Sequence, residues 1–125
     1  MSDNVAVVTG AARGIGLAIA ERFLADGYCV ALLDIDAQTL QQTAARLGTR
    51  PDVLAVECDV ADPPRVANAV DAVVARFGRI DALVNNAGIA IFKPILDTSF
   101  DEWSQVLSVN LCGPFLCTQA CAPVM

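Results

Sequence analysis

The sequence lacks most of the side chains that transfer protons or bind metals near neutral pH. Its 125 residues include no histidine, one tyrosine (Tyr28) and one lysine (Lys93). The five cysteines form no C-x-x-C pair, and without histidine the usual zinc-ligand spacings are missing too. We therefore expect no metal site, and we interpret the cysteines as small apolar packing residues in a reducing compartment.

Long apolar runs are also missing. Glycine, proline or a charged residue interrupts each run before it reaches the roughly 18 residues that a membrane helix needs. The first residues, MSDNVAVV, carry neither the basic region nor the cleavage pattern of a signal peptide. A net charge of −6 argues against a nucleic-acid or anionic-membrane partner. We expect a cytoplasmic protein with neither kind of partner.

What the sequence does contain is a regular alternation of short apolar runs and helical stripes. The runs predict strands at 5–9, 29–34, 52–59 and 80–85, and the stripes predict helices at 14–26, after Asp36, after Asp62-Pro63 and after Ser99. Continuously apolar strands that alternate with helices are typical of a parallel sheet covered on both faces. We predict an α/β fold, a Rossmann-type doubly wound parallel sheet with strand order 3-2-1-4, in a single domain spanning 1–125.

The end of the chain is unusual for a complete domain. Gly113-Pro114 interrupts the last helical stripe and is expected to break its hydrogen-bond ladder, and the chain stops at Met125 without a capping glycine. The fourth strand would also remain an exposed apolar edge. We therefore expect the N-terminal part of a longer protein, apparently truncated, which by itself is marginally stable or aggregates.

A glycine-rich stretch connects the first strand to the first helix. Gly10, Gly14 and Gly16 have the spacing of a loop in which glycines permit a tight turn, close approach to a pyrophosphate and close helix packing. The pyrophosphate would meet the N–H groups and positive dipole of the helix start. We assign Gly10, Arg13, Gly14, Ile15 and Gly16 to cofactor binding; as simple turn residues, the glycines would need no ligand.

Asp34 ends the second strand 18 residues after Gly16, where an acidic residue can bind the ribose hydroxyls. Its carboxylate would repel the 2′-phosphate of NADP, and Ile35 adds no positive charge. Arg13 could still help to bind a phosphate, and Asp34 could be no more than a solvated strand end. The sequence thus favours NAD over NADP, with Asp34 and Ile35 at the ribose.

Four motifs in order resemble those of the short-chain dehydrogenase/reductase family. They are T-G-x-x-x-G-x-G from Thr9 to Gly16, Asp59-Val60, Asn85-Asn86-Ala87-Gly88, and Asn110. The resemblance covers essentially the whole chain. It implies that Asp59 bonds the adenine amino group, that Val60 lines the adenine pocket, and that Asn85, Ala87 and Gly88 lie along the nucleotide. Asp59 could equally form a turn before Pro63, and the Asn85–Gly88 motif could be a structural turn.

Asn110 lies seven residues after Trp103 and so shares the apolar stripe of its helix. We expect it to face inward, where a buried amide needs hydrogen-bond partners. It could be a helix-bending polar residue, whereas the resemblance implies a catalytic residue that holds a water in a proton relay.

The resemblance further implies an NAD(P)-dependent oxidoreductase that transfers hydride between nicotinamide and an alcohol or carbonyl substrate, and a homo-oligomer when full length. In the family, a Ser and a Tyr-x-x-x-Lys perform the acid–base step. Tyr28 is followed four residues later by Leu32, and Lys93 has no tyrosine at that spacing. We therefore expect the 125-residue chain alone to be inactive. The alternatives are a non-catalytic dinucleotide-binding module and an inactive truncated product.

Overall fold

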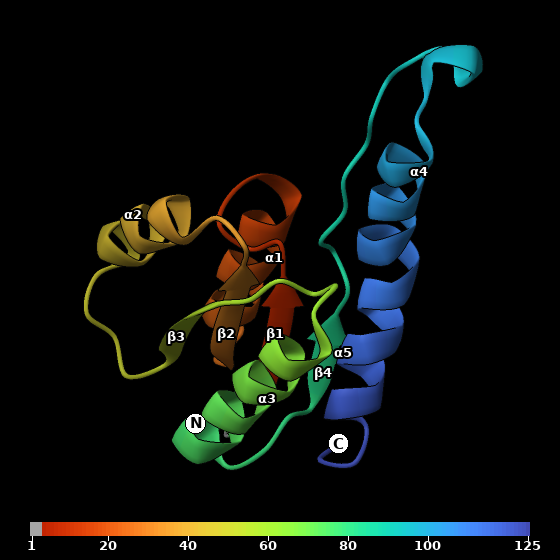
Figure 1. Ribbon diagram of the computed structural model, residues 1–125. Helices are drawn as coiled ribbons and strands as arrows, with labels where there is room; N and C mark the ends of the chain where they lie inside the picture. Colours follow the sequence, from red (N-terminus) through yellow and green to blue (C-terminus); the bar gives the residue numbers. More distant parts are fainter. Residues whose placement is uncertain (1–3) are drawn as a thin grey trace.

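The structure is a computed structural model that describes residues 4–125, and its centre is a four-stranded parallel sheet (Figure 1). The strands are β1 (Val5–Thr9), β2 (Cys29–Asp34), β3 (Val53–Glu57) and β4 (Ala82–Val84). Their order is β3-β2-β1-β4 and every neighbouring pair is parallel. The predicted fold class and strand order are therefore confirmed.

Helices follow each strand at the positions that the stripes predict. They are α1 (Gly14–Ala25), α2 (Ala37–Leu47), α3 (Pro63–Phe77), a 3-10 turn η1 (Ile95–Asp97), α4 (Phe100–Leu107), a π-helical segment η2 (Ser108–Cys112) and α5 (Gly113–Cys121). Asp36 caps α2 by accepting a hydrogen bond from the Thr39 N–H, and Ser99 with Glu102 forms a full capping box on α4. Asp62 precedes α3 but makes no side-chain cap, so Pro63 in the first turn marks this helix start.

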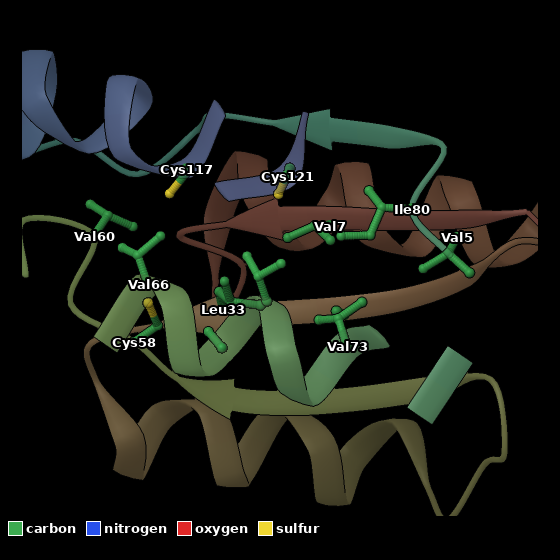
Figure 2. Close-up of a cluster of buried hydrophobic side chains, with 13 residues drawn as sticks. Val5, Val7, Leu33, Cys58, Val60, Val66, Val73, Ile80, Cys117 and Cys121 are labelled. Atoms are coloured by element: carbon green, nitrogen blue, oxygen red, sulfur yellow. The ribbon is translucent and has the colours of Figure 1, made fainter. Parts of the chain in front are cut away.

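The two faces of the sheet bury two separate apolar clusters. Val5 and Val7 of β1 point to one face, where they pack with α3 and the end of α5, whereas Ala6 and Val8 point to the other, against α1 and α2. Figure 2 shows the first cluster, with Cys117 and Cys121 of α5 reaching it from above. Because successive strand residues face opposite sides, helices on both faces give the strands the continuous apolar character seen in the sequence.

Two strands are shorter than predicted. The prediction of 52–59 becomes Val53–Glu57, and 80–85 becomes Ala82–Val84. Just beyond the carboxyl end of each strand a side-chain hydrogen bond takes over: Asp59 accepts from the Ala61 N–H at 2.9 Å, and the Asn86 N–H donates to the Thr9 hydroxyl at 3.0 Å. Asx-type turns and loop anchors of this kind compete with the sheet for backbone groups.

The predicted break at Gly113-Pro114 is wrong. The rod formed by α4, η2 and α5 is continuous, and Pro114 stands in the first turn of α5 (Figure 1). The wider π-helical turn over Ser108–Cys112 shifts the hydrogen-bond register just before the proline, which accommodates the missing N–H. Gly113 allows close packing, because a Cβ there would lie 2.7 Å from Cγ2 of Val60. The absent side chain lets α5 approach the loop after β3.

The α4 end of this rod projects past the strands (Figure 1), and large apolar side chains along α4, η2 and α5 are exposed. Phe100 is 78% exposed, Trp103 53%, Leu111 65% and Phe115 62%. Within the described part of the chain, β4 pairs only with β1, and its side chains are half-buried. Within residues 4–125, no helix has both the length and the apolar character needed to cross a membrane.

Candidate functional site

A cleft of about 440 Å³ opens beyond the carboxyl ends of β1, β2 and β4. Its wall is formed by Gly10, Arg13, Asp34, Ile35, Asp36, Cys58, Asp59, Val60, Asn86, Ala87, Gly88, Ile89, Gln105 and Val109. The strand order reverses between β1 and β4, and open parallel sheets bind ligands at such a reversal. The location alone therefore makes this cleft the candidate ligand site.

The glycine loop forms one wall through backbone shapes that other residues rarely adopt. Gly10 and Gly14 have φ values of +65° and +60°. A Cβ on Gly16 would overlap the Gly10 carbonyl oxygen and lie 2.5 Å from Nδ2 of Asn86, so this glycine is required for packing. A Cβ on Gly14 would meet nothing within 4 Å, so the space above the loop stays open.

Hydrogen bonds from behind hold the loop in this shape. The Ala12 N–H donates to Oδ2 of Asp34 at 3.0 Å, and the Ala12 carbonyl accepts from the Thr43 hydroxyl at 2.5 Å. The Ala11 N–H donates to the Leu33 carbonyl at 3.1 Å. The first N–H groups of α1 have no partner within the helix, so they are available to an anion.

The mouth of the cleft carries a small network of charged side chains. Asp34 accepts two backbone N–H bonds, from Ala12 and from Asp36, each at 3.0 Å. Asp36 accepts from the Thr39 N–H at 3.1 Å and from the Thr39 hydroxyl at 2.7 Å, and it pairs with Nη2 of Arg13 at 2.8 Å. The Thr39 bonds, with a smaller contribution from Arg13, lower the pKa of Asp36. Asp36 therefore stays negative well below neutral pH.

The opposite wall is fastened to the glycine loop by Thr9 and Asn86. The Asn86 amide donates to the carbonyls of Thr9 at 3.1 Å and Gly10 at 3.2 Å, while the Thr9 hydroxyl accepts the N–H groups of Asn86 and Ala87, each at 3.0 Å. Asn86 was not among the predicted site residues. Asn85, which was, donates to the Thr118 hydroxyl at 3.3 Å and lies outside the cleft wall, and its contact with a nucleotide stays a prediction.

The expectation that Asn110 faces inward is wrong, because Asn110 is exposed. It lies in η2, a segment with no buried residues. Its partners are nevertheless well defined: Oδ1 accepts from the Ile89 N–H and Nδ2 donates to the Ile89 carbonyl, both at 2.8 Å. Asn110 thus fixes the strand-exit loop beside Gly88 and retains one N–H and one lone pair for a further partner.

The residues that the sequence assigned to the site divide into two groups. Those that line the cleft are Gly10, Arg13, Asp34, Ile35, Asp59, Val60, Ala87 and Gly88. Those outside its wall are Gly14, Ile15, Gly16, Asn85 and Asn110. The wall residues that sequence reasoning missed are Asp36, Cys58, Asn86, Ile89, Gln105 and Val109. Asp36 was recognised only as a helix cap; its place two residues after Asp34 was the available signal.

Cys58 lines the cleft yet is not a nucleophile at neutral pH. Burial raises its pKa to about 11, and burial likewise raises the pKa of Cys117 to about 12. Both side chains stay protonated, and they pack in the apolar cluster of Figure 2. All five cysteines are free, and residues 4–125 contain no group of His, Cys, Asp or Glu arranged to hold a metal ion.

The tyrosine and the lysine are not part of the cleft wall and are engaged with other residues. Tyr28 packs against Phe23 with ring centroids 4.9 Å apart, within the cluster on the α1 face. Nζ of Lys93 pairs with Oε2 of Glu102 at 2.6 Å. Neither side chain is placed to exchange a proton with a molecule in the cleft.

A dinucleotide fits what this cleft offers. The open space above Gly14 and the free N–H groups of the α1 start suit a pyrophosphate, and the Asp34 carboxylate suits a pair of hydroxyls. The apolar side of Val60 suits a flat base. The described residues therefore offer groups that suit a nucleotide, and neither Tyr28 nor Lys93 is among those that form the cleft wall.

Comparisons with known proteins agree with this geometry. D-threitol dehydrogenase of Mycolicibacterium smegmatis is 46% identical over 121 residues, which are 96% of this chain and 46% of that protein. Galactitol 2-dehydrogenase of Agrobacterium fabrum is 41% identical over 125 residues, which are 100% of this chain and 48% of that protein. The chain thus spans about half the length of these relatives.

Solved structures also match nearly the whole of this chain over about half of their own length. A 3-ketoacyl-(acyl-carrier-protein) reductase from Brucella melitensis, complexed with NADH, matches with a TM-score of 0.91 and 34% identity, over 97% of this chain and 50% of that one. A glucose/ribitol dehydrogenase of the same organism matches with a TM-score of 0.94 and 35% identity, over 99% and 53%. The family model described as short chain dehydrogenase matches residues 4–125. The chain belongs to the short-chain dehydrogenase family.

Proposed function

We propose that the protein carrying this chain is an NAD-dependent oxidoreductase that transfers hydride between nicotinamide and an alcohol or carbonyl carbon. The observation that carries the proposal is the Asp34 carboxylate at the mouth of the cleft, tied by hydrogen bonds to Ala12 of the glycine loop and to Asp36 at the start of α2. A carboxylate at this position can accept bonds from two ribose hydroxyls and repels an added phosphate.

In this proposal each wall of the cleft binds one part of the dinucleotide. The glycine loop and the start of α1 bind the pyrophosphate, Asp59 and Val60 bind the adenine, and Ala87 with Gly88 lines the path towards the nicotinamide. When bound, the nicotinamide supplies the hydride chemistry.

Asn110 has a positioning role in this scheme. Its bidentate bond to Ile89 fixes the loop after Gly88, and its remaining N–H and lone pair can orient a water. An amide does not supply a proton at neutral pH, so the acid must be another group. Tyr28 and Lys93 are engaged elsewhere, which supports our expectation that residues 1–125 alone do not turn over substrate.

Cofactor titration tests the proposal. NADH should bind the complete, purified protein more tightly than NADPH. Asp34→Ala should narrow the difference in affinity between the two nucleotides. Asp59→Asn, which keeps an acceptor for the Ala61 N–H, is the matched control and should not change the preference. Tighter binding of NADPH by the unmodified protein would refute the NAD assignment.

A second candidate function is a dinucleotide-binding module without catalysis, favoured by the missing proton donor. D-threitol and galactitol, named by the two relatives above, are the first substrates to test. NADH formation by the complete protein supports the oxidoreductase. Tight NADH binding without turnover of any alcohol or carbonyl would favour the binding module.

A further inference from the structure

The cleft wall contains a single basic side chain. Within residues 4–125, its charged members are Arg13, Asp34, Asp36 and Asp59. Any attraction for an additional phosphate near the ribose would therefore have to come from Arg13. Arginine is well suited to this task, since its planar fork can form two parallel bonds with a phosphate.

Arg13 is held by a carboxylate that is itself fixed. Asp36 is anchored at the start of α2 by the N–H and the hydroxyl of Thr39. Arg13, by contrast, has a side chain that is 69% exposed, and its Nη2 donates to Oδ2 of Asp36 at 2.8 Å. In this pair Asp36 is the anchor and Arg13 is the partner able to move.

The pair is strong enough to orient a side chain and weak enough to yield to a better ligand. An exposed ion pair contributes little to stability, whereas hydrogen bonds from arginine to phosphate are among the stronger ones. Asp36 stays negatively charged at neutral pH, because its hydrogen bonds from Thr39 lower its pKa. Asp36 therefore competes with a bound phosphate for Arg13.

Asp34 and Asp36 consequently have different tasks. Asp34 uses both oxygens to hold backbone N–H groups and presents its charge to the ribose position. We propose that Asp36 is a second specificity-determining residue, which selects against a 2′-phosphorylated nucleotide by keeping Arg13 in an ion pair. The proposal rests on the dinucleotide function above and deepens it.

Four forms of the purified protein test this mechanism in NADH and NADPH titrations: the unmodified protein, Asp36→Asn, Arg13→Gln and the double variant. Asparagine is an equally good helix cap, so Asp36→Asn removes the charge without removing the cap. We expect Asp36→Asn to tighten NADPH binding about tenfold relative to NADH binding. In the Arg13→Gln background the same substitution should give no gain.

The double variant separates this mechanism from simple charge removal. If the loss of one negative charge were sufficient, Asp36→Asn would tighten NADPH binding equally with and without Arg13. That result, or an unchanged NADPH affinity in Asp36→Asn while NADH still binds, overturns the inference and leaves the proposed function intact. Failure of the unmodified protein to bind either nucleotide overturns both.

Folding is checked with a second substitution at the same position. Asp36→Ser also retains the cap, and it should reproduce the gain in NADPH affinity with a circular dichroism spectrum like that of the unmodified protein. A gain in one variant that the other does not share would show that asparagine itself binds the phosphate, against the proposal.

Discussion

Gly14 and Gly16 are two residues apart, yet their missing side chains leave different spaces. At Gly16 an added methyl group meets the Gly10 carbonyl and the Asn86 amide, both held in place by hydrogen bonds. At Gly14 it meets no atom within 4 Å. One glycine is thus required by the packing of the protein itself, whereas the other faces open space.

This difference predicts opposite results for two alanine variants. Gly16→Ala should destabilise the fold by about 3 kcal/mol or more, since rigid backbone must move. Gly14→Ala should cost only about 1–2 kcal/mol of backbone strain, but it should weaken NADH binding about tenfold or more because the methyl group occupies the phosphate space. Urea unfolding and NADH titration measure the two effects. Equal destabilisation by both variants would contradict the distinction.

Thr43 belongs to none of the sequence motifs. It is buried, and its hydroxyl donates to the Ala12 carbonyl from the middle of α2. Thr43→Val should leave that carbonyl without a partner and cost about 1–3 kcal/mol of unfolding free energy. NADH affinity should fall as well, because the loop loses its support from behind.

Thr43→Ser is the matched control, since it keeps the hydroxyl and removes only a methyl group. Urea unfolding of the serine variant should stay closer to the unmodified protein than that of the valine variant. If the two variants unfold alike, the hydroxyl has no supporting role.

At the scale of elements, most boundaries were predictable because they depend on local chemistry. The cap at Asp36 and the capping box at Ser99 are interactions between residues three positions apart. The strand order also followed, since apolar strands joined by helical crossovers leave few arrangements. None of these inferences needed knowledge of distant contacts.

The sequence was less informative where a shift of one position along the chain reverses the direction of a side chain. Asn85 and Asn86 are adjacent, and successive residues of an extended chain face opposite sides. Without the position of the strand end, the motif could not show that Asn86 meets the glycine loop. Asn110 was misplaced for another reason: an apolar stripe indicates a buried helix face, and here that face is uncovered.

The start of α4 gives a prediction about pH. The Lys93 ammonium and the Ser99 N–H lower the pKa of Glu102 from the ordinary 4.5 to about 2. Because the folded pKa is the lower one, the stabilisation by Glu102 is complete above about pH 4.5 and is lost as the pH falls towards 2. The difference in melting temperature between the unmodified protein and Glu102→Gln should therefore shrink over that window.

Lys93→Met provides the control, since it removes the larger of the two causes. NMR titration of the Glu102 carboxyl should show its pKa higher in this variant than in the unmodified protein. A Glu102 that titrates near its ordinary value with Lys93 present would contradict the ion pair.

For the molecule as a whole, the uncovered stripe of α4 and α5 is the dominant surface feature. Trp103, Leu107, Leu111 and Phe115 recur every fourth residue and are all exposed. Contiguous apolar surface of this kind associates in water. We expect residues 1–125, produced alone, to self-associate or aggregate, as judged by sedimentation velocity over a range of concentrations.

Replacing Trp103 and Phe115 with glutamate should reduce that association. The matched control places glutamate at Phe92, which is 95% exposed on the loop after β4, outside the stripe, and should have little effect. A concentration-independent monomer with one cooperative unfolding transition would show that the stripe does not drive association.

The Thr9 hydroxyl has a consequence for local opening of the backbone beside the cleft. It accepts the N–H groups of Asn86 and Ala87, although these residues belong to neither a helix nor a strand. Their amide protons should therefore exchange with deuterium as slowly as those of the adjoining strands, because exposure requires β1 and the segment after β4 to separate. Nucleotide entry would then leave these protons undisturbed, and Thr9→Val should make both exchange quickly while the amides of α2 keep their protection.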